Sequence, residues 1–190
     1  MSDASPTRSA VVELKDERRA MHEGYVFLDE KCLLLAGEIL RQLGLHAGLQ
    51  RTLAARHSAA LLALQAAVAR HGLHGLQVAP APTGEGWQLA LERSLLMGVK
   101  LQSATLQGQA GEAPAAGEGS PELAACREAF AALLAASAPL AAVSGNLERL
   151  SAEYRKAVRR ARALQDVMLP ELDGTIREFE GRLAEMEQEE

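Results

Sequence analysis

The residues of this sequence that could do chemistry are few, and their spacing favours none of the common catalytic or metal sites. His71 and His74 stand three positions apart, so on a helix they would share a face as zinc-binding histidines do. They border Gly72 and Gly75, however, and no third ligand lies nearby in the sequence. No GxxxxGK[ST] phosphate loop, GxSxG elbow or HExxH pair occurs in the chain. The sequence therefore predicts a protein that is not itself an enzyme and holds no metal or cofactor.

Charged residues are the second source of candidate sites. The net charge of −5 gives no basic field of the kind that binds nucleic acid, so no nucleic-acid partner is expected. Locally, one cluster of basic side chains stands out: Arg155, Lys156, Arg159, Arg160 and Arg162. Such a cluster could meet an acidic partner, and a solvated helix face is the ordinary alternative.

Apolar residues at helical spacing run through both ends of the chain, and they must position any such site. In the first part the spacing alternates between three and four, interrupted only by Arg18, and the stripe then continues less regularly as far as Gly72 and Gly75. This pattern is a heptad stripe of about four repeats and predicts a long helix over 1–71. Its members are Val11, Leu14, Met21, Tyr25, Leu28, Cys32, Leu35 and Ile39.

The far end of the chain repeats this pattern over 121–190, where Ser120-Pro121-Glu122 has the composition of a helix start. Two consecutive steps of four residues, from Leu164 to Met168 and on to Leu172, form a stutter with Pro170 inside it. A stutter unwinds a helix locally, and an unwound turn is where a proline costs least. The stripe comprises Leu147, Leu150, Tyr154, Ala157, Ala161, Leu164 and Met168, then Leu172, Ile176, Phe179, Leu183 and Met186.

A narrow apolar stripe flanked by charge cannot form a core alone, so each terminal helix needs a partner, and the nearest candidate is the other one. The predicted fold is therefore mainly α, a long antiparallel two-helix coiled coil formed by the N- and C-terminal helices. With so few aromatic residues, 3% of the chain, helix seams are a better use of the alanine and leucine than a thick core.

The middle segment, 72–120, is expected at one tip of this coil. It begins with a turn-rich loop at 79–86 and ends with a flexible Gly/Ala/Glu-rich loop at about 108–120. Between them, alternating apolar residues predict a short β-hairpin over about 86–102 that turns across Glu92-Arg93-Ser94.

Cys32 and Cys126 are the only cysteines. Antiparallel pairing of the ends puts Cys32 opposite the region near 165 and Cys126 opposite the region near 71, too far apart for a disulfide. A reducing, cytoplasmic location follows. The longest apolar run, 129–144, is shorter than the roughly 20 residues of a membrane span and contains Pro139, so no direct membrane insertion is expected.

Several stretches resemble the D subunit of V/A-type ATPases and ATP synthases. The opening PTRSAVVELKDERRAMHEGYVFLDEKCLLL is similar to that protein's first long helix, which begins with Pro-Thr-Arg and carries a Glu-Gly. The ending EYRKAVRRARALQDVMLPELDGTIREFEGRLAEMEQEE resembles its last helix, with Arg-Arg-x-x-Ala-Leu and a proline before Leu-x-x-Thr-Ile. Met97-Gly98-Val99-Lys100 is similar to its hairpin motif.

The resemblance implies a non-catalytic rotor subunit of the central stalk, cytoplasmic and peripheral to the membrane. It would couple ATP hydrolysis or synthesis to ion translocation, with a catalytic hexamer of A and B subunits, a small F subunit of the stalk and a funnel subunit (C/d type) above the membrane ring as partners. Candidate contacts with the catalytic head are Arg18, Arg19, Arg155, Lys156, Arg159, Arg160 and Arg162. Candidate contacts with the small partner are Trp87, Leu95, Met97 and Val99. A coiled-coil hairpin adaptor or tether of another assembly is the alternative that periodicity leaves open.

Overall fold

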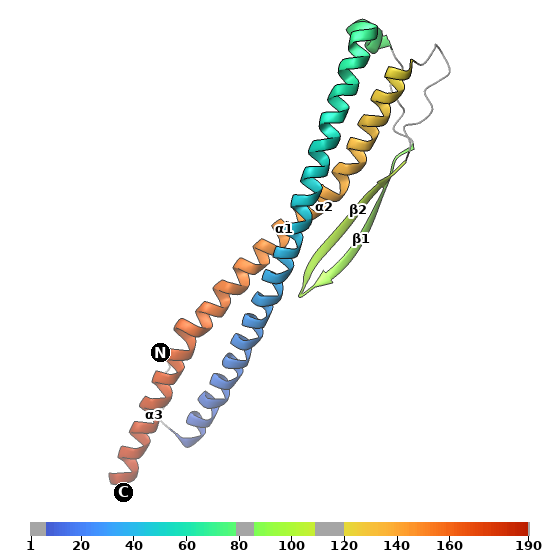
Figure 1. Ribbon diagram of the computed structural model, residues 1–190. Helices are drawn as coiled ribbons and strands as arrows, with labels where there is room; N and C mark the ends of the chain where they lie inside the picture. Colours follow the sequence, from blue (N-terminus) through green and yellow to red (C-terminus); the bar gives the residue numbers. More distant parts are fainter. Residues whose placement is uncertain (1–6, 79–85, 109–119, 190) are drawn as a thin grey trace. The chain divides into compact units, whose positions relative to one another are not determined.

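The computed structural model describes residues 7–78, 86–108 and 120–189. In chain order the elements are α1 (Arg8–Val78), β1 (Gln88–Leu96), β2 (Val99–Gln107), α2 (Pro121–Ala163), the π-helical segment η2 (Leu164–Met168) and α3 (Leu169–Glu189) (Figure 1). The predicted fold, mainly helical with long terminal helices and a small antiparallel hairpin between them, is confirmed. The loops expected at 79–86 and 108–120 lie outside the described ranges, apart from residues 86, 108 and 120.

The chain divides into two compact units. The terminal unit contains the residues up to Gly37 and those from Ser151 onward, and the middle unit is Glu38–Leu150. Each unit therefore holds part of α1 and part of the long C-terminal helix.

Ion pairs across the terminal unit show that its two helices run antiparallel. Arg8 pairs with Glu187, Lys15 Nζ lies 2.6 Å from Glu180 Oε1, Arg18 pairs with Asp173, and Lys31 Nζ lies 2.6 Å from Glu153 Oε1. As the residue numbers rise along α1, those of their partners fall. The buried side chains of this unit all belong to the predicted heptad stripes, which confirms the seam: Val11, Leu35, Ala157, Ala161 and Ile176.

The register of this pairing differs from the expected one. Lys31 contacts Glu153, so Cys32 lies opposite the region near 153 rather than near 165. Packing of the seam sets the register, and counting from the chain ends did not capture it. Both cysteines are free thiols, as predicted.

The predicted stutter is a π-helical turn. Residues Leu164–Met168 adopt π-helical geometry, in which the Leu169 N–H donates a hydrogen bond to the Leu164 carbonyl. The helix then continues to Glu189. Pro170 follows this wide turn directly. A proline has no N–H to donate and its ring crowds the carbonyl four residues earlier, so a preceding π turn relieves both problems.

The apolar run around Pro139 lies inside α2, so the proline does not end the helix. By length and composition alone, the continuous helical stretch Pro121–Glu189 contains a window apolar enough to cross a membrane, of which 11% is buried. Most side chains of the apolar run around Pro139 are half-buried.

The ends of α1 and α2 meet in the middle unit. Gly72 interrupts α1 with φ 65° and ψ 170°, at the position where the sequence predicts the first helix to end. Ser120 then opens α2, as predicted, because its Oγ accepts the Leu123 N–H at 3.2 Å. His71 Nε2 lies 2.6 Å from the same Oγ, and Arg70 Nε lies 3.3 Å from Glu122 Oε2.

The hairpin turns at Met97-Gly98, and the expected turn across Glu92-Arg93-Ser94 is wrong. Those three residues lie within β1, which pairs with β2 in continuous antiparallel register from Gln88↔Gln107 to Leu96↔Val99. Met97 and Gly98 both have positive φ, 47° and 87°. A two-residue hairpin loop requires this conformation, because its twist matches that of the strands. Gly98 at the second position was the sequence signal from which this turn could have been predicted.

Candidate partner-binding surfaces

The basic cluster of α2 is a solvent-facing patch in the terminal unit. Its five members, Arg155, Lys156, Arg159, Arg160 and Arg162, are all exposed, whereas Ala157 and Ala161 between them are buried. The cluster therefore faces away from the seam. No ion pair or hydrogen bond engages these five side chains within the described part of the chain.

The cluster also acts on a nearby carboxylate, Glu153. Glu153 accepts a hydrogen bond from Lys31 Nζ, and this bond, with the nearby charges of Lys156 and Arg160, lowers the pKa of Glu153. Lys31 and Glu153 are 14% and 28% exposed, which makes this the most sheltered ion pair across the terminal unit. The cluster thus lies beside the Lys31–Glu153 ion pair, and its own basic side chains remain exposed to solvent.

Arg18 and Arg19, the other candidate head contacts, are exposed but already have partners in the chain. Arg18, which interrupts the apolar stripe, pairs with Asp173 on α3, and Arg19 pairs with Asp16 at 2.8 Å on its own helix. Exposed ion pairs of this kind contribute about 0.2–1 kcal/mol to the free energy of unfolding. An acidic group of a partner could therefore replace Asp173 or Asp16 as the partner of these arginines. The structure places Arg18 beside α3 rather than beside the basic cluster of α2.

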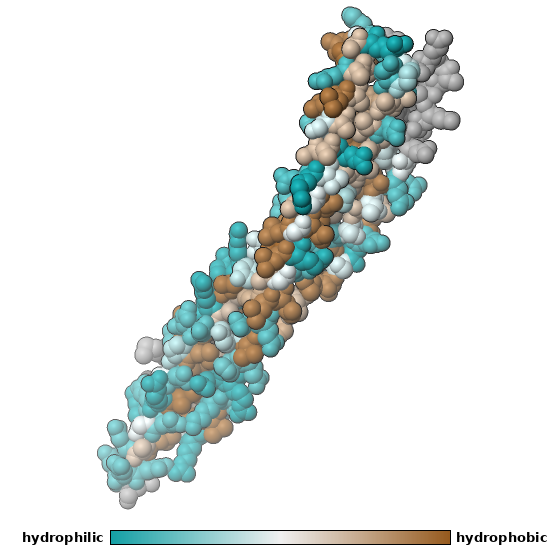
Figure 2. All heavy atoms as spheres, viewed as in Figure 1, coloured by the Kyte–Doolittle hydropathy of each residue, from teal (hydrophilic) through white to brown (hydrophobic). Residues whose placement is uncertain are grey.

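An apolar patch on α1 in the terminal unit was not predicted from the sequence. Phe27, Leu33 and Leu34 are 57%, 69% and 53% exposed, and they lie outside the heptad stripe that packs against the C-terminal helix. The signal was present as apolar residues at positions the stripe does not use. Figure 2 shows apolar side chains at the surface among polar ones along the helices.

The four hairpin candidates differ in their exposure. Leu95 is 70% exposed, Trp87 and Met97 are half-buried, and Val99 is 6% exposed, so Val99 belongs to the core and not to the free surface. Leu89 and Leu91, which sequence analysis used only to predict the strand, are 54% and 48% exposed. β1 is exposed over nearly its whole length, whereas β2 carries the buried residues of the hairpin.

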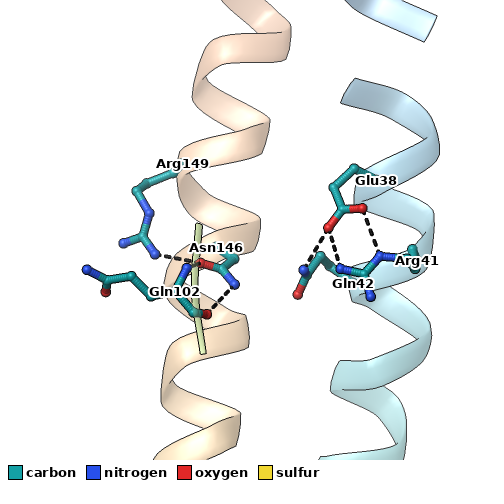
Figure 3. A network of polar contacts seen from close by, with 6 residues as sticks. All are labelled: Glu38, Arg41, Gln42, Gln102, Asn146 and Arg149. Carbon is teal, nitrogen blue, oxygen red and sulfur yellow. Dashed lines mark hydrogen bonds and ion pairs between the residues drawn. The ribbon is translucent and has the colours of Figure 1, made fainter. Parts of the chain in front are cut away.

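Asn146 on α2 holds the hairpin to the helix, and sequence analysis did not identify it. Its Oδ1 accepts the Gln102 N–H at 2.9 Å while its Nδ2 donates to the Gln102 carbonyl at 2.8 Å (Figure 3). Arg149 Nε donates to the Lys100 carbonyl at 2.9 Å, and Arg149 also donates to Asn146 Oδ1 at 2.6 Å. Asn146 is 2% exposed. A lone amide in an alanine- and leucine-rich helix was the available signal.

A polar cavity of about 200 Å³ lies beside this contact in the middle unit, lined in part by Gln42, Glu92, Ser103 and Asn146. Gln42 is 4% exposed and donates to Glu38 at 2.8 Å, while its Oε1 has no partner among the described residues (Figure 3). Hydrogen bonds from the Arg41 guanidinium lower the pKa of Glu38. Glu38, Arg41 and Gln42 thus form a polar contact within the middle unit.

His71 and His74 do not form a metal site with other residues of the described ranges. His71 is engaged with Ser120, and no group of three His, Cys, Asp or Glu side chains gathers within those ranges.

The described surfaces are therefore a basic cluster, an apolar patch and an exposed strand on a helical scaffold. A family model for the D subunit of ATP synthase matches residues 10–190. The chain belongs to this ATP synthase family. Membership makes it a component of a membrane-associated, multisubunit ATP synthase of the V/A type.

Three relatives in this family align over nearly the full chain. The D subunit of the V-type ATP synthase of Thermotoga neapolitana is 26% identical, covering 98% of this chain and 92% of the relative. The D subunit of the A-type ATP synthase of Thermococcus gammatolerans is also 26% identical, covering 98% and 89%. The D subunit of the A-type ATP synthase of Methanopyrus kandleri is 24% identical, covering 100% and 83%.

Replacing Asn146 by leucine should detach the hairpin from α2 in this member of the ATP synthase family. Asn146→Leu leaves the Gln102 N–H and carbonyl unpaired against an apolar side chain, which costs about 1–3 kcal/mol. Amide exchange at Gln102 should accelerate while the β1–β2 ladder remains protected. The matched control is Ser144→Ala, because Ser144 donates only to the Leu140 carbonyl of its own helix. Unchanged exchange at Gln102 would contradict the role of Asn146.

Proposed function

We propose that this chain is the central-stalk rotor subunit of a V/A-type rotary ATPase or ATP synthase, a non-catalytic axle that couples ATP hydrolysis or synthesis to ion translocation. The observation that carries the proposal is the unpaired basic cluster on the outside of an antiparallel helix pair, in a chain of this ATP synthase family. An axle needs stiffness and an uneven surface, and it needs no active site.

Stiffness comes from the way the terminal unit is tied together. Buried seam residues such as Leu35 and Ile176 alternate with cross-helix ion pairs along both helices. Packed seams of this kind resist separation and twisting of two helices. The rotor therefore turns as one body over this part of the chain.

Coupling comes from the uneven charge. The basic cluster occupies one side of the terminal unit, so a surrounding head meets a different surface at each angle of rotation. If one conformation of a catalytic interface binds the cluster more tightly than another, that difference in free energy links the conformation to the angle. ATP hydrolysis in the head then drives rotation, and rotation driven from the membrane drives synthesis.

The proposed partners are those that the family resemblance implies. The catalytic hexamer of A and B subunits contacts the terminal unit through the basic cluster together with Arg18 and Arg19. The small F subunit contacts the hairpin through Trp87, Leu95 and Met97, and a funnel subunit (C/d type) links the stalk to the membrane ring. The chain itself is cytoplasmic and peripheral to the membrane.

Reconstitution tests the proposal. Membrane vesicles that contain the A and B hexamer and the membrane ring are assembled with and without this chain, and hydrolysis and ion transport are measured on the same preparation. We expect ATP-driven ion transport only when the chain is present, and no ATP turnover by the purified chain. Turnover that survives removal of the head subunits would contradict the rotor role. Co-purification with another assembly, and not with the A and B subunits, would instead indicate an adaptor or tether.

A further inference from the structure

The outer edge of β1 is an open strand edge. Leu96 and Val99 close the two-residue turn, so they form a hydrogen-bonded pair, and the pairing then alternates along the antiparallel ladder. Ala90, Glu92 and Ser94 therefore direct their backbone groups toward β2. The backbone groups of the alternate residues point away from β2, toward the outer edge: Leu89, Leu91, Arg93 and Leu95.

The contact with Asn146 supports this assignment independently. Gln102 lies opposite Arg93 in the register, and both its N–H and its carbonyl are bound by Asn146 at the far side of β2. Since Gln102 directs these groups away from β1, Arg93 directs its own groups away from β2. The two sides of the hairpin thus have different environments, one covered by α2 and one open (Figure 1).

Of the features that commonly protect edge strands, the described part of this edge has one, the charge of Arg93. Within the described residues no backbone group outside the hairpin pairs with β1. The strand has nine residues in unbroken register, without a proline or a bulge. Long exposed edges of this kind recruit another strand unless a charge, proline, bulge or covering element prevents it.

The side chains along the edge indicate which strand would fit. Leu89, Leu91 and Leu95 alternate along β1 and project to the same side of the sheet, at 54%, 48% and 70% exposure. Arg93 lies among them on that side and forms no ion pair within the described ranges. A complementary strand is therefore apolar at alternate positions and carries a carboxylate opposite Arg93.

We propose that the outer edge of β1 binds an extended strand of another protein of the complex by β-strand addition, with alternate apolar residues over the three leucines and an acidic residue opposite Arg93. Backbone hydrogen bonds at the four edge residues supply affinity, and the leucines and Arg93 supply register and specificity. The inference rests on the proposed role of the hairpin as a partner-binding element and specifies the mode of binding.

A synthetic peptide tests this binding mode on the full-length chain. The probe has nine residues, alternates valine with threonine and carries a glutamate at its central apolar position. A control peptide has the same composition in an order that does not alternate. Binding of the probe should slow amide exchange at residues 89, 91, 93 and 95, while amides at 90, 92 and 94 are already protected by the ladder.

Two substitutions separate strand addition from other docking. Leu91→Pro removes an N–H that points away from β2, so the ladder persists while the edge loses a donor, and probe affinity should fall at least about tenfold, a change of about 1.4 kcal/mol. Leu91→Thr is the matched control, because it keeps the N–H and suits a strand. Arg93→Glu should weaken the glutamate peptide and strengthen the same peptide with lysine in the central position.

Three outcomes would overturn the inference: equal binding of both peptides, probe binding that Leu91→Pro and Arg93→Glu leave unchanged, or concentration-dependent pairing of the chain with itself through the same amides. The proposed function is judged separately by co-purification of the small stalk partner. If Leu95→Ser prevents that co-purification and Leu91→Pro does not, the hairpin binds its partner without strand addition. If neither substitution matters, the hairpin is not the partner-binding element.

Discussion

Deleting residues 175–190 should uncouple the complex, so that ATP hydrolysis persists while ion transport per ATP falls. The deletion removes about 24 Å of helix at a rise of about 1.5 Å per residue. It takes away the buried Ile176 and the carboxylates that pair with Arg8 and Lys15, Glu187 and Glu180. The first turns of α1 then lose their seam and fray. Under the rotor proposal, a head that surrounds a shortened and frayed axle still cycles but transmits less torque.

A shorter deletion provides the control for this experiment. Removing residues 188–190 leaves Glu187, the last ion-pair partner of α1, in place. It should leave coupling unchanged. Binding of the small partner at the hairpin should survive both deletions, because the deleted residues belong to the terminal unit and share none of the hydrogen bonds that hold the hairpin to α2. Full coupling after the longer deletion would show that this segment is not part of the drive contact, and loss of small-partner binding would show that the partners are assigned to the wrong ends.

Local sequence information was enough for the helices, their seam and the irregularity within the last helix. The steps of four from Leu164 to Leu172, with Pro170 among them, specify a π turn because both signals act within a few residues of one another. The start of α2 is equally local, since the Ser120 hydroxyl caps a helix that begins at Pro121. Spacing therefore predicts features whose cause lies along the chain.

Features that depend on contacts between segments far apart in the sequence could not be predicted from local spacing. The exchange of two hydrogen bonds between Asn146 and Gln102 requires α2 to lie along β2, and nothing near Asn146 in the sequence indicates that strand. Arg18 interrupted the apolar stripe, and nothing near it in the sequence indicates that it pairs with Asp173. The hairpin turn was a different failure, because alternation over Glu92–Ser94 was continuous and the positive-φ pair Met97-Gly98 was the stronger signal.

Reversing the charge of two residues of the basic cluster should weaken binding of the catalytic head more than any single change elsewhere on the terminal unit. Arg155 and Arg159 lie four residues apart, are exposed and form no ion pair within the described ranges, so replacing both with glutamate costs little folding free energy. If the cluster faces acidic groups of the A and B subunits, the same change brings like charges together. Such contacts cost several kcal/mol, and affinity for the hexamer should fall on the order of a hundredfold at low salt, with a smaller loss at high salt.

The matched control makes the same change of net charge in the middle unit. Arg51 and Arg56 are also exposed arginines on a long helix, and neither forms an ion pair within the described residues. The double variant Arg51→Glu, Arg56→Glu should bind the hexamer as the unmodified chain does, provided that head binding depends on the position of the charge. Affinity is measured by titrating the A and B hexamer with each chain at two salt concentrations, with thermal unfolding as the check that all variants fold. Equal losses for both double variants would mean that net charge alone governs association, and no loss for Arg155→Glu, Arg159→Glu would remove the cluster from the proposed drive contact.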